Sequence, residues 1–264
     1  MTHERLAMRH TDSWQDSKRR FVVTMVLASL VLMALLCANL CIGSVGMSPA
    51  ELLGALAAGP GASGLEASVI WQIRLPRAVS AAILGGALAC SGFLLQTFFN
   101  NPIASPYILG ISAGAKCALA AVMICVIGAG GALASWQVVG AAFVGSLAAT
   151  ALVLGMSTKI RSMSMLIVAG VMAGYVFNAI TDFLVTFASD QNIVNLHNWA
   201  LGSFSGATWS QVGVEAAVCA AGFAASMALA KPMAAFQLGE GYAKSVGVNV
   251  KLFRAALIAV ASLL

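Results

Sequence analysis

Residues 21–43 read FVVTMVLASLVLMALLCANLCIG, and they follow the basic triplet Lys18-Arg19-Arg20. A helix needs about 20 apolar residues to cross the hydrocarbon core of a bilayer, and this run reaches that length without a charged residue. The apolar region of a secretory signal peptide is shorter, roughly 7–15 residues. The stretch therefore predicts a retained transmembrane helix and not a cleaved leader.

The rest of the chain repeats this pattern. Further apolar runs occupy residues 78–99, 107–129, 136–156, 164–188 and 208–230, and a seventh begins near Phe253 and reaches Leu264. The chain has 264 residues, of which 60% are hydrophobic and 9% charged, whereas a soluble domain is about 25% charged. The sequence predicts an all-α, polytopic transmembrane helix bundle with six complete spans and the start of a seventh. It argues against a water-soluble enzyme and against a nucleic-acid partner.

The positions of the basic residues predict the orientation. With the N-terminus inside, the inner segments hold eleven of the 14 Lys and Arg residues, namely Arg5, Arg9, Lys18, Arg19, Arg20, Lys159, Arg161, Lys231, Lys244, Lys251 and Arg254. Cytoplasmic loops carry an excess of Lys and Arg. We therefore expect residues 1–20 to be a cytoplasmic segment and residues 21–264 to be the membrane domain, with a cytoplasmic loop at 231–252.

The chain carries no readable catalytic constellation or metal-ligand pattern. Gly110–Gly114 fits GxSxG, but that motif needs a strand–turn–helix and a partner histidine, and all three histidines lie outside the predicted spans. No Walker A pattern occurs. We expect no enzymatic activity, no metal site and no cofactor bound by this chain. Within the spans the ionisable residues are few (Lys116, Asp182 and the marginal Glu215), which argues mildly against ion-coupled transport.

Residues 71–77, WQIRLPR, precede the second span on its outer side. Arg74 and Arg77 stand three residues apart, and we expect Pro76 to set the geometry at the start of the helix. The two arginines are either headgroup anchors or a positive outer patch that receives carboxylates of a docking partner, because guanidinium groups pair well with carboxylates.

Residues 100–106, NNPIASP, contain two prolines and two amides at a span boundary. This composition predicts broken backbone, which membrane proteins tolerate only where protein or a water-filled cavity surrounds it. A simple tight turn and a segment of a translocation path are equally compatible with it.

Residues 236–248, FQLGEGYAKSVGV, predict a short amphipathic helix on the inner side. Leu238, Tyr242 and Val246 recur at a spacing of four, Glu240 and Lys244 form an i, i+4 pair, and Gly247 suits the C-terminal cap. Such a helix either lies flat on the membrane or fits a groove on a cytoplasmic partner.

Three motifs in order, IRLPR (73–77), QxxxxNP (96–102) and LGExxAxSxG (238–247), resemble the FecCD family of permease subunits. Members of this family serve ATP-driven importers for iron–siderophore complexes, haem and vitamin B12. The resemblance implies about ten spans in the cytoplasmic (inner) membrane, a homodimer, two cytoplasmic ABC ATPase subunits that use ATP and Mg²⁺, and an extracytoplasmic substrate-binding protein. Three further spans would then follow the seventh, so the resemblance implies a C-terminally truncated permease.

The resemblance also implies roles for individual residues. Arg74 and Arg77 would dock the binding protein. The ATPase-coupling segment would comprise Leu238, Gly239, Glu240, Tyr242, Ala243, Lys244 and Gly247. The translocation path and its inner gate would comprise Gln96, Asn101, Pro102, Ile103, Ser162, Met163 and Ser164.

The expected function is import of an iron–siderophore or related metal chelate by alternating access. The open alternatives are an ion-coupled secondary carrier or channel, and a non-transporting truncated fragment.

Overall fold

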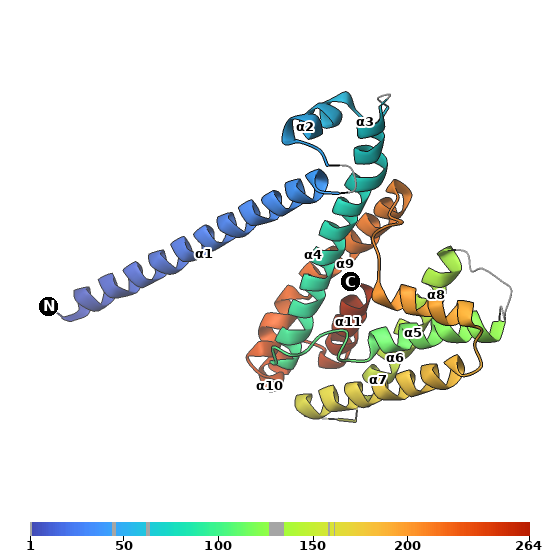
Figure 1. Cartoon of the computed structure of the whole chain (residues 1–264). Coiled ribbons are helices and arrows are strands. Elements are labelled where there is room, and N and C mark those ends of the chain that lie inside the picture. The colour runs from blue at the N-terminus through green and yellow to red at the C-terminus, as the bar shows by residue number, and fades with distance from the viewer. Residues whose placement is uncertain (1, 44–45, 62–63, 127–134, 158, 161) are drawn as a thin grey trace. The chain divides into compact units, whose positions relative to one another are not determined.

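The structure is a computed structural model that describes residues 2–43, 46–61, 64–126, 135–157, 159–160 and 162–264. Every regular element in these ranges is a helix (Figure 1), so the all-α prediction is confirmed. The chain divides into two compact units, residues 1–79 with 207–209, and residues 80–206 with 210–264.

The first unit contains α1 (Thr2–Cys41), α2 (Pro49–Ala58), α3 (Leu65–Val69), the π-helical turn η1 (Ile70–Arg74) and the start of α4 (Leu75–Phe99). A small core of Met47, Leu52, Ala55 and Ile70 joins α2 to η1. The indole of Trp71 donates a hydrogen bond to the Ala55 carbonyl (3.0 Å). The part of the link between the first two predicted spans that forms α2 is therefore helical and packed against η1.

Pro76 does not mark the start of a helix, contrary to the sequence-based expectation. The helical path runs without a break from Leu65 to Phe99. Because proline has no backbone N–H, the regular bond is lost there, and the preceding turn is widened so that Leu75 N–H donates to Ile70 O. A π-helical turn absorbs the proline, which composition alone does not reveal.

The second unit contains the rest of α4 together with α5 (Ile111–Ala121), η2 (Val122–Val126), α6 (Ser135–Ser157), α7 (Met163–Val185), α8 (Asp190–Leu201), most of α9 (Trp209–Gln237), α10 (Glu240–Ser245) and α11 (Val250–Leu263). Its core gathers Phe98, Leu95, Phe253 and Leu257 from α4 and α11. Phe236 of α9 stacks on Phe98, with ring centroids 5.3 Å apart.

Five helices are long and apolar enough to cross a membrane: Ser17–Cys41, Leu65–Phe99, Trp136–Met156, Ser164–Val185 and Trp209–Gln237. They agree with five of the six complete spans predicted. The third differs: α5 begins at Ile111 and not at 107, because the preceding residues form turns that end at Gly110 (φ +76°). Part of that prediction, 127–129, lies outside the described residues.

Two further boundaries differ from the sequence-based prediction. Helix α9 continues through Lys231 and Pro232 to Gln237, so the inner loop begins about seven residues later than predicted. Helix α11, which was predicted as the start of a seventh span, begins at Val250, three residues before Phe253. The Asn249 side chain accepts a hydrogen bond from Leu252 N–H and caps the helix there.

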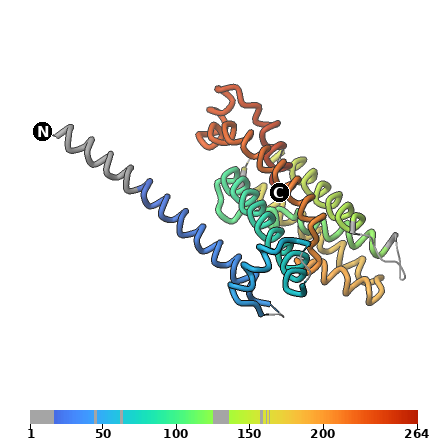
Figure 2. Tube along the Cα trace, turned by 90° about the horizontal axis from the view of Figure 1, so that it is seen from above, coloured from blue at the N-terminus to red at the C-terminus, as the bar shows by residue number. Residues whose placement is uncertain are grey.

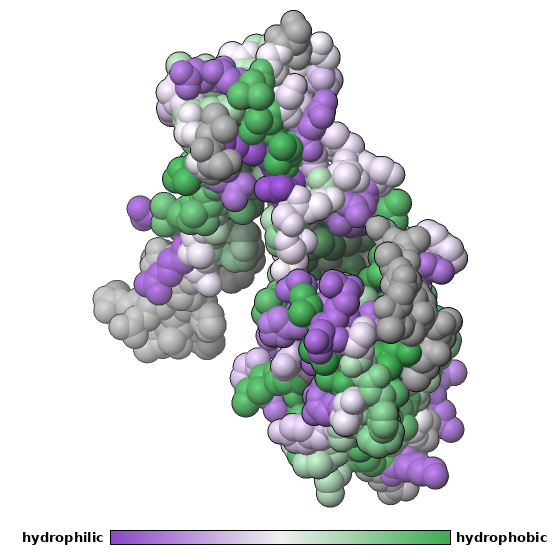
Figure 3. Space-filling model, turned by 45° about the vertical axis from the view of Figure 1, so that its right-hand side comes forward, coloured by the Kyte–Doolittle hydropathy of each residue, from purple (hydrophilic) through white to green (hydrophobic). Residues whose placement is uncertain are grey.

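Helices α5, α6 and α7 pack side by side (Figures 1 and 2). The contact of α5 with α6 depends on glycine, because a Cβ atom at Gly114 would lie 2.7 Å from the Gly145 carbonyl oxygen. Lipid supplies no hydrophobic drive between helices, so such close backbone approach provides the packing contacts. Apolar side chains remain at the surface (Figure 3), which suits contact with membrane lipid.

Candidate functional site

The predicted amphipathic helix is present as α10, six residues long. Two glycines with positive φ, Gly239 (+116°) and Gly247 (+88°), flank it. Val248 N–H donates to the Ala243 carbonyl (2.9 Å), and Gly247 N–H donates to the Lys244 carbonyl (3.1 Å). This pair of bonds closes the helix at a left-handed glycine as the sequence predicts. Ala243 is fully buried and anchors α10 on the protein.

Three apolar side chains of this segment are exposed. Leu238, Tyr242 and Val246 are 70%, 49% and 53% exposed. Leu238 precedes α10 and Val246 follows it, so the three residues do not lie on one continuous helix as their spacing predicted. These three side chains nevertheless expose apolar surface on and next to α10. Ion pairs of Glu240 hold α10 in position.

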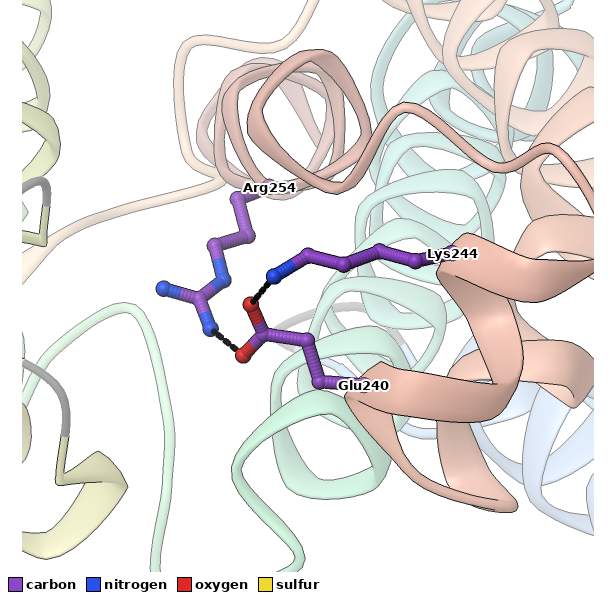
Figure 4. A network of polar contacts seen from close by, with 3 residues as sticks. All are labelled: Glu240, Lys244 and Arg254. Atoms are coloured by element: carbon purple, nitrogen blue, oxygen red, sulfur yellow. Dashed lines mark hydrogen bonds and ion pairs between the residues drawn. The ribbon is translucent and has the colours of Figure 1, made fainter.

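Glu240 joins α10 to α11 through a three-residue network (Figure 4). Lys244 Nζ lies 2.8 Å from Glu240 Oε1, which agrees with the predicted pair. Arg254 Nη2 lies 2.8 Å from Glu240 Oε2. The guanidinium carbon of Arg254 also lies 5.9 Å from the centre of the Phe236 ring. No periodic pattern in the sequence pairs Arg254 with Glu240, because the two residues are 14 positions apart and lie on either side of a loop.

An open pocket of about 840 Å³ lies beside this network. Glu240, Lys244 and Arg254 line one part of it, and Ile160, from the connection between α6 and α7, lines another. Ser162 follows two residues later and caps α7 by accepting a hydrogen bond from Met165 N–H (3.5 Å). The coupling segment and the chain leading into the predicted gate stretch therefore border one pocket.

Of the gate residues that follow, Ser164 is exposed in the first turn of α7. Met163 is the first residue of that helix, and its side chain lies outside the described residues. The gate role of all three residues stays a prediction.

The predicted broken backbone around Asn101 is present. The Asn101 side-chain oxygen accepts a hydrogen bond from Ile103 N–H (2.9 Å). The backbone N–H of Asn101 donates to the Gln96 carbonyl (3.0 Å). Pro102 and Ile103 are exposed. The side chain of Asn101 thus satisfies the backbone N–H of the residue that follows the proline, as in an Asx turn.

Gln96 lines a second open pocket, of about 520 Å³, with Ser105, Pro106, Tyr107 and Ser112. The fold therefore brings Gln96 together with the end of the broken segment and the start of α5. This pocket agrees with a path-lining position for Gln96, whose role stays a prediction.

Arg74 is buried in the first unit, with 7% of its surface exposed. Its Nη1 donates hydrogen bonds to the carbonyls of Leu40 (2.5 Å) and Cys41 (3.2 Å), at the C-terminal end of α1. Helix ends leave carbonyls without intrahelical partners, and a cation there is favourable. Arg74 therefore has a structural contact that the sequence did not indicate, and docking through it would require the guanidinium to leave these carbonyls.

Arg77 lies one turn further along α4 and is half-buried. It is less enclosed than Arg74, so the fold separates two arginines that the sequence treated as a pair. Docking of a binding protein by either residue stays a prediction.

Helices long enough to span a bilayer, a broken segment at a pocket and a short exposed helix are the features of a polytopic membrane permease fold. The model of the FecCD transport family matches residues 31–264. The chain belongs to this family, so the resemblance is confirmed.

Two relatives are the "Vitamin B12 import system permease protein BtuC" of Klebsiella pneumoniae and of Salmonella arizonae. The first is 32% identical over 230 residues (87% of this chain and 66% of the relative), and the second is 30% identical over 244 residues (92% and 70%). The chain thus spans about two-thirds of the length of the relatives it matches.

A solved structure has a similar fold. It is a metal-chelate type ABC transporter in an inward-facing conformation, with a TM-score of 0.72 and 24% sequence identity over 89% of this chain and 71% of that one. The likeness concerns the fold, which it confirms as a polytopic permease bundle.

Proposed function

We propose that this chain acts as the permease subunit of an ATP-driven importer in the cytoplasmic membrane, and that its cargo is a metal chelate or a corrinoid. Family membership and the two vitamin B12 relatives support the class of cargo. The partners would be two cytoplasmic ATPases, an extracytoplasmic binding protein and a second permease copy. ATP and Mg²⁺ would belong to the ATPases.

The ion pair that attaches α10 to α11 supports the proposed mechanism, in which α10 transmits movement of the ATPases to the membrane helices. The exposed apolar residues Leu238, Tyr242 and Val246 would fit a groove on the ATPase. Glu240 and Arg254 would pass the movement of α10 directly to α11. Phe236, at the end of α9 just before α10, stacks on Phe98 and would pass the movement on to α4. Alternating access requires that ATP binding favours one conformation over the other, and two attachments to the spans give such a movement a direct route.

Co-purification tests the coupling role. Tyr242→Asp together with Leu238→Asp should lower ATPase recovery with the permease by about tenfold or more, because charges would enter an apolar interface. Leu53→Asp, an equally exposed apolar position on α2, is the matched control and should leave recovery unchanged. Full ATPase recovery with the double variant would contradict the coupling role.

Uptake into proteoliposomes tests the function itself. The complete gene product, reconstituted with its ATPase and binding protein, should accumulate a corrinoid or a ferric chelate only with ATP. Uptake without ATP under a proton or sodium gradient would instead support an ion-coupled carrier.

A further inference from the structure

Lys116 occupies the middle of α5, inside an apolar helix, and its side chain is half-buried. A charged side chain at membrane depth is costly unless a partner or a water-filled cavity accommodates it. Among the described residues no carboxylate pairs with Lys116. The other ionisable groups of the spans do not serve it: Glu215 accepts a hydrogen bond from Ser80 (2.5 Å), and Asp182 is exposed on α7.

Lys116 lines an open pocket of about 700 Å³ between α5, α7 and α8. Ligand sites commonly occupy roughly 300–1,000 Å³. Three aromatic residues, Tyr107, Tyr175 and Trp199, share the lining with Lys116. Asn178 adds an amide, which can both donate and accept hydrogen bonds.

The floor of this pocket is rigid. A Cβ atom at Gly110 would lie 2.8 Å from the Gly174 backbone nitrogen, so the start of α5 and the middle of α7 touch through their backbones. Both glycines line the pocket. Their close approach fixes the positions from which Lys116 and Tyr175 project, and pre-organised groups bind a ligand with less loss of entropy.

The chemistry of the lining selects among ligands. A lysine without a carboxylate partner attracts an anion and repels a cation. Aromatic side chains provide faces and edges for packing against planar rings. An anion with aromatic rings satisfies both features, whereas an aliphatic, uncharged ligand satisfies neither.

We propose that this pocket is a binding subsite for an anionic chelate with aromatic metal-binding groups, of the ferric tris-catecholate type, and that Lys116 supplies its counter-charge. The inference deepens the proposed function and rests on it for the direction of transport. Binding itself depends only on the pocket. A lipid phosphate is also negatively charged but has no aromatic rings. The experiment therefore distinguishes an anionic chelate from a lipid phosphate as the occupant of the pocket.

The first measurement is binding to the purified complete gene product in detergent, followed by tryptophan fluorescence. The probes are a trianionic ferric tris-catecholate and an uncharged ferric tris-hydroxamate. Lys116→Met should weaken catecholate binding by about tenfold or more, because it removes the counter-charge to the anion, while hydroxamate binding stays within about twofold. Lys116→Arg should restore most of the catecholate binding. Lys231→Met, at an exposed lysine of α9, is the matched control.

Equal loss of both chelates in Lys116→Met would overturn the proposal, as would unchanged catecholate binding or no catecholate binding by the wild type. The lipid arm repeats the measurement in nanodiscs of phosphatidylcholine with and without phosphatidylglycerol. If phosphatidylglycerol abolishes catecholate binding to the wild type, the site belongs to a lipid phosphate and the proposal fails.

The second measurement is ATP-driven uptake of the same chelates. Lys116-dependent binding without any uptake would leave the subsite standing and contradict the proposed transport function. Uptake of the catecholate at equal rates by wild type and Lys116→Met would contradict the subsite and leave the transport function standing.

Discussion

Glu240 of α10 forms an ion pair with Arg254 of α11, in which Nη2 of the arginine lies 2.8 Å from Oε2 of the carboxylate. The same carboxylate pairs with Lys244 within α10, but the two cations differ in environment. The Arg254 side chain is 14% exposed and the Lys244 side chain is 63% exposed. Exposed ion pairs contribute about 0–1 kcal/mol. The link between the helices therefore depends on Arg254 far more than on Lys244.

Loss of Arg254 should uncouple the ATPases from transport. We expect Arg254→Met to lower the amount of cargo moved per ATP hydrolysed several-fold, because α10 loses its charged attachment to α11. Lys244→Met should have a small effect. The check is uptake and ATP hydrolysis measured together in proteoliposomes, and the reversed pair Glu240→Arg with Arg254→Glu should recover part of the loss. Equal coupling ratios in Arg254→Met and wild type would rule out this role.

Close packing of α5 on α6 should be sensitive to any side chain at Gly114. Gly114→Ala places a methyl group 2.7 Å from the Gly145 carbonyl oxygen, and overpacking of this kind costs about 1–3 kcal/mol. We expect a lower Tm in detergent. Gly140→Ala on α6 meets no atom within 4 Å and serves as the control. If both variants melt together with the wild type, the helices do not approach as closely as described.

Substitution of Arg74 and of Arg77 should have different effects, because Arg74 is buried and Arg77 is half-buried. Arg74→Glu leaves the Leu40 and Cys41 carbonyls without their donor, and an unsatisfied buried polar group costs about 1–3 kcal/mol. We expect faster proteolysis near residues 41–47 and a lower Tm. Arg77→Glu should lower the Tm less than Arg74→Glu does, because Arg77 is less enclosed, and should weaken docking of the binding protein at low salt. Docking that survives Arg77→Glu would remove the arginine patch from the proposed interface.

The start of α2 should depend on pH through Glu51. Hydrogen bonds from the Ser48 backbone, and then from its side chain, lower the pKa of Glu51 below its ordinary value. A lowered pKa in the folded state stabilises the helix above the unfolded pKa of about 4.3. That stabilisation disappears as the pH falls through the lower, folded pKa. The hydrogen-exchange protection of the α2 amides, which is the intrinsic exchange rate at each pH divided by the observed rate, should therefore fall at acidic pH. Glu51→Gln, which cannot titrate, should abolish this loss of protection.

The sequence predicted secondary structure correctly where features within a few residues are enough to determine it. The apolar run at 21–43 and the pattern of 238–247 yielded a span and a capped helix, because length, periodicity and a left-handed glycine act within a few residues. Pro76 and Pro232 were misread as helix boundaries. Neighbouring turns accommodate both prolines, by a π-helical turn in one case and within α9 in the other.

Residue identity alone determined the class of this protein. Its composition, the order of its spans and three spaced motifs indicated a FecCD-type permease, because bilayer thickness and backbone hydrogen bonding leave so few alternatives for an apolar chain. Only the tertiary structure decided which charges meet. It buried Arg74 at the end of α1, attached Glu240 to Arg254 and placed Lys116 in an aromatic pocket. Such pairings depend on helix packing across long sequence separations, which no local pattern encodes.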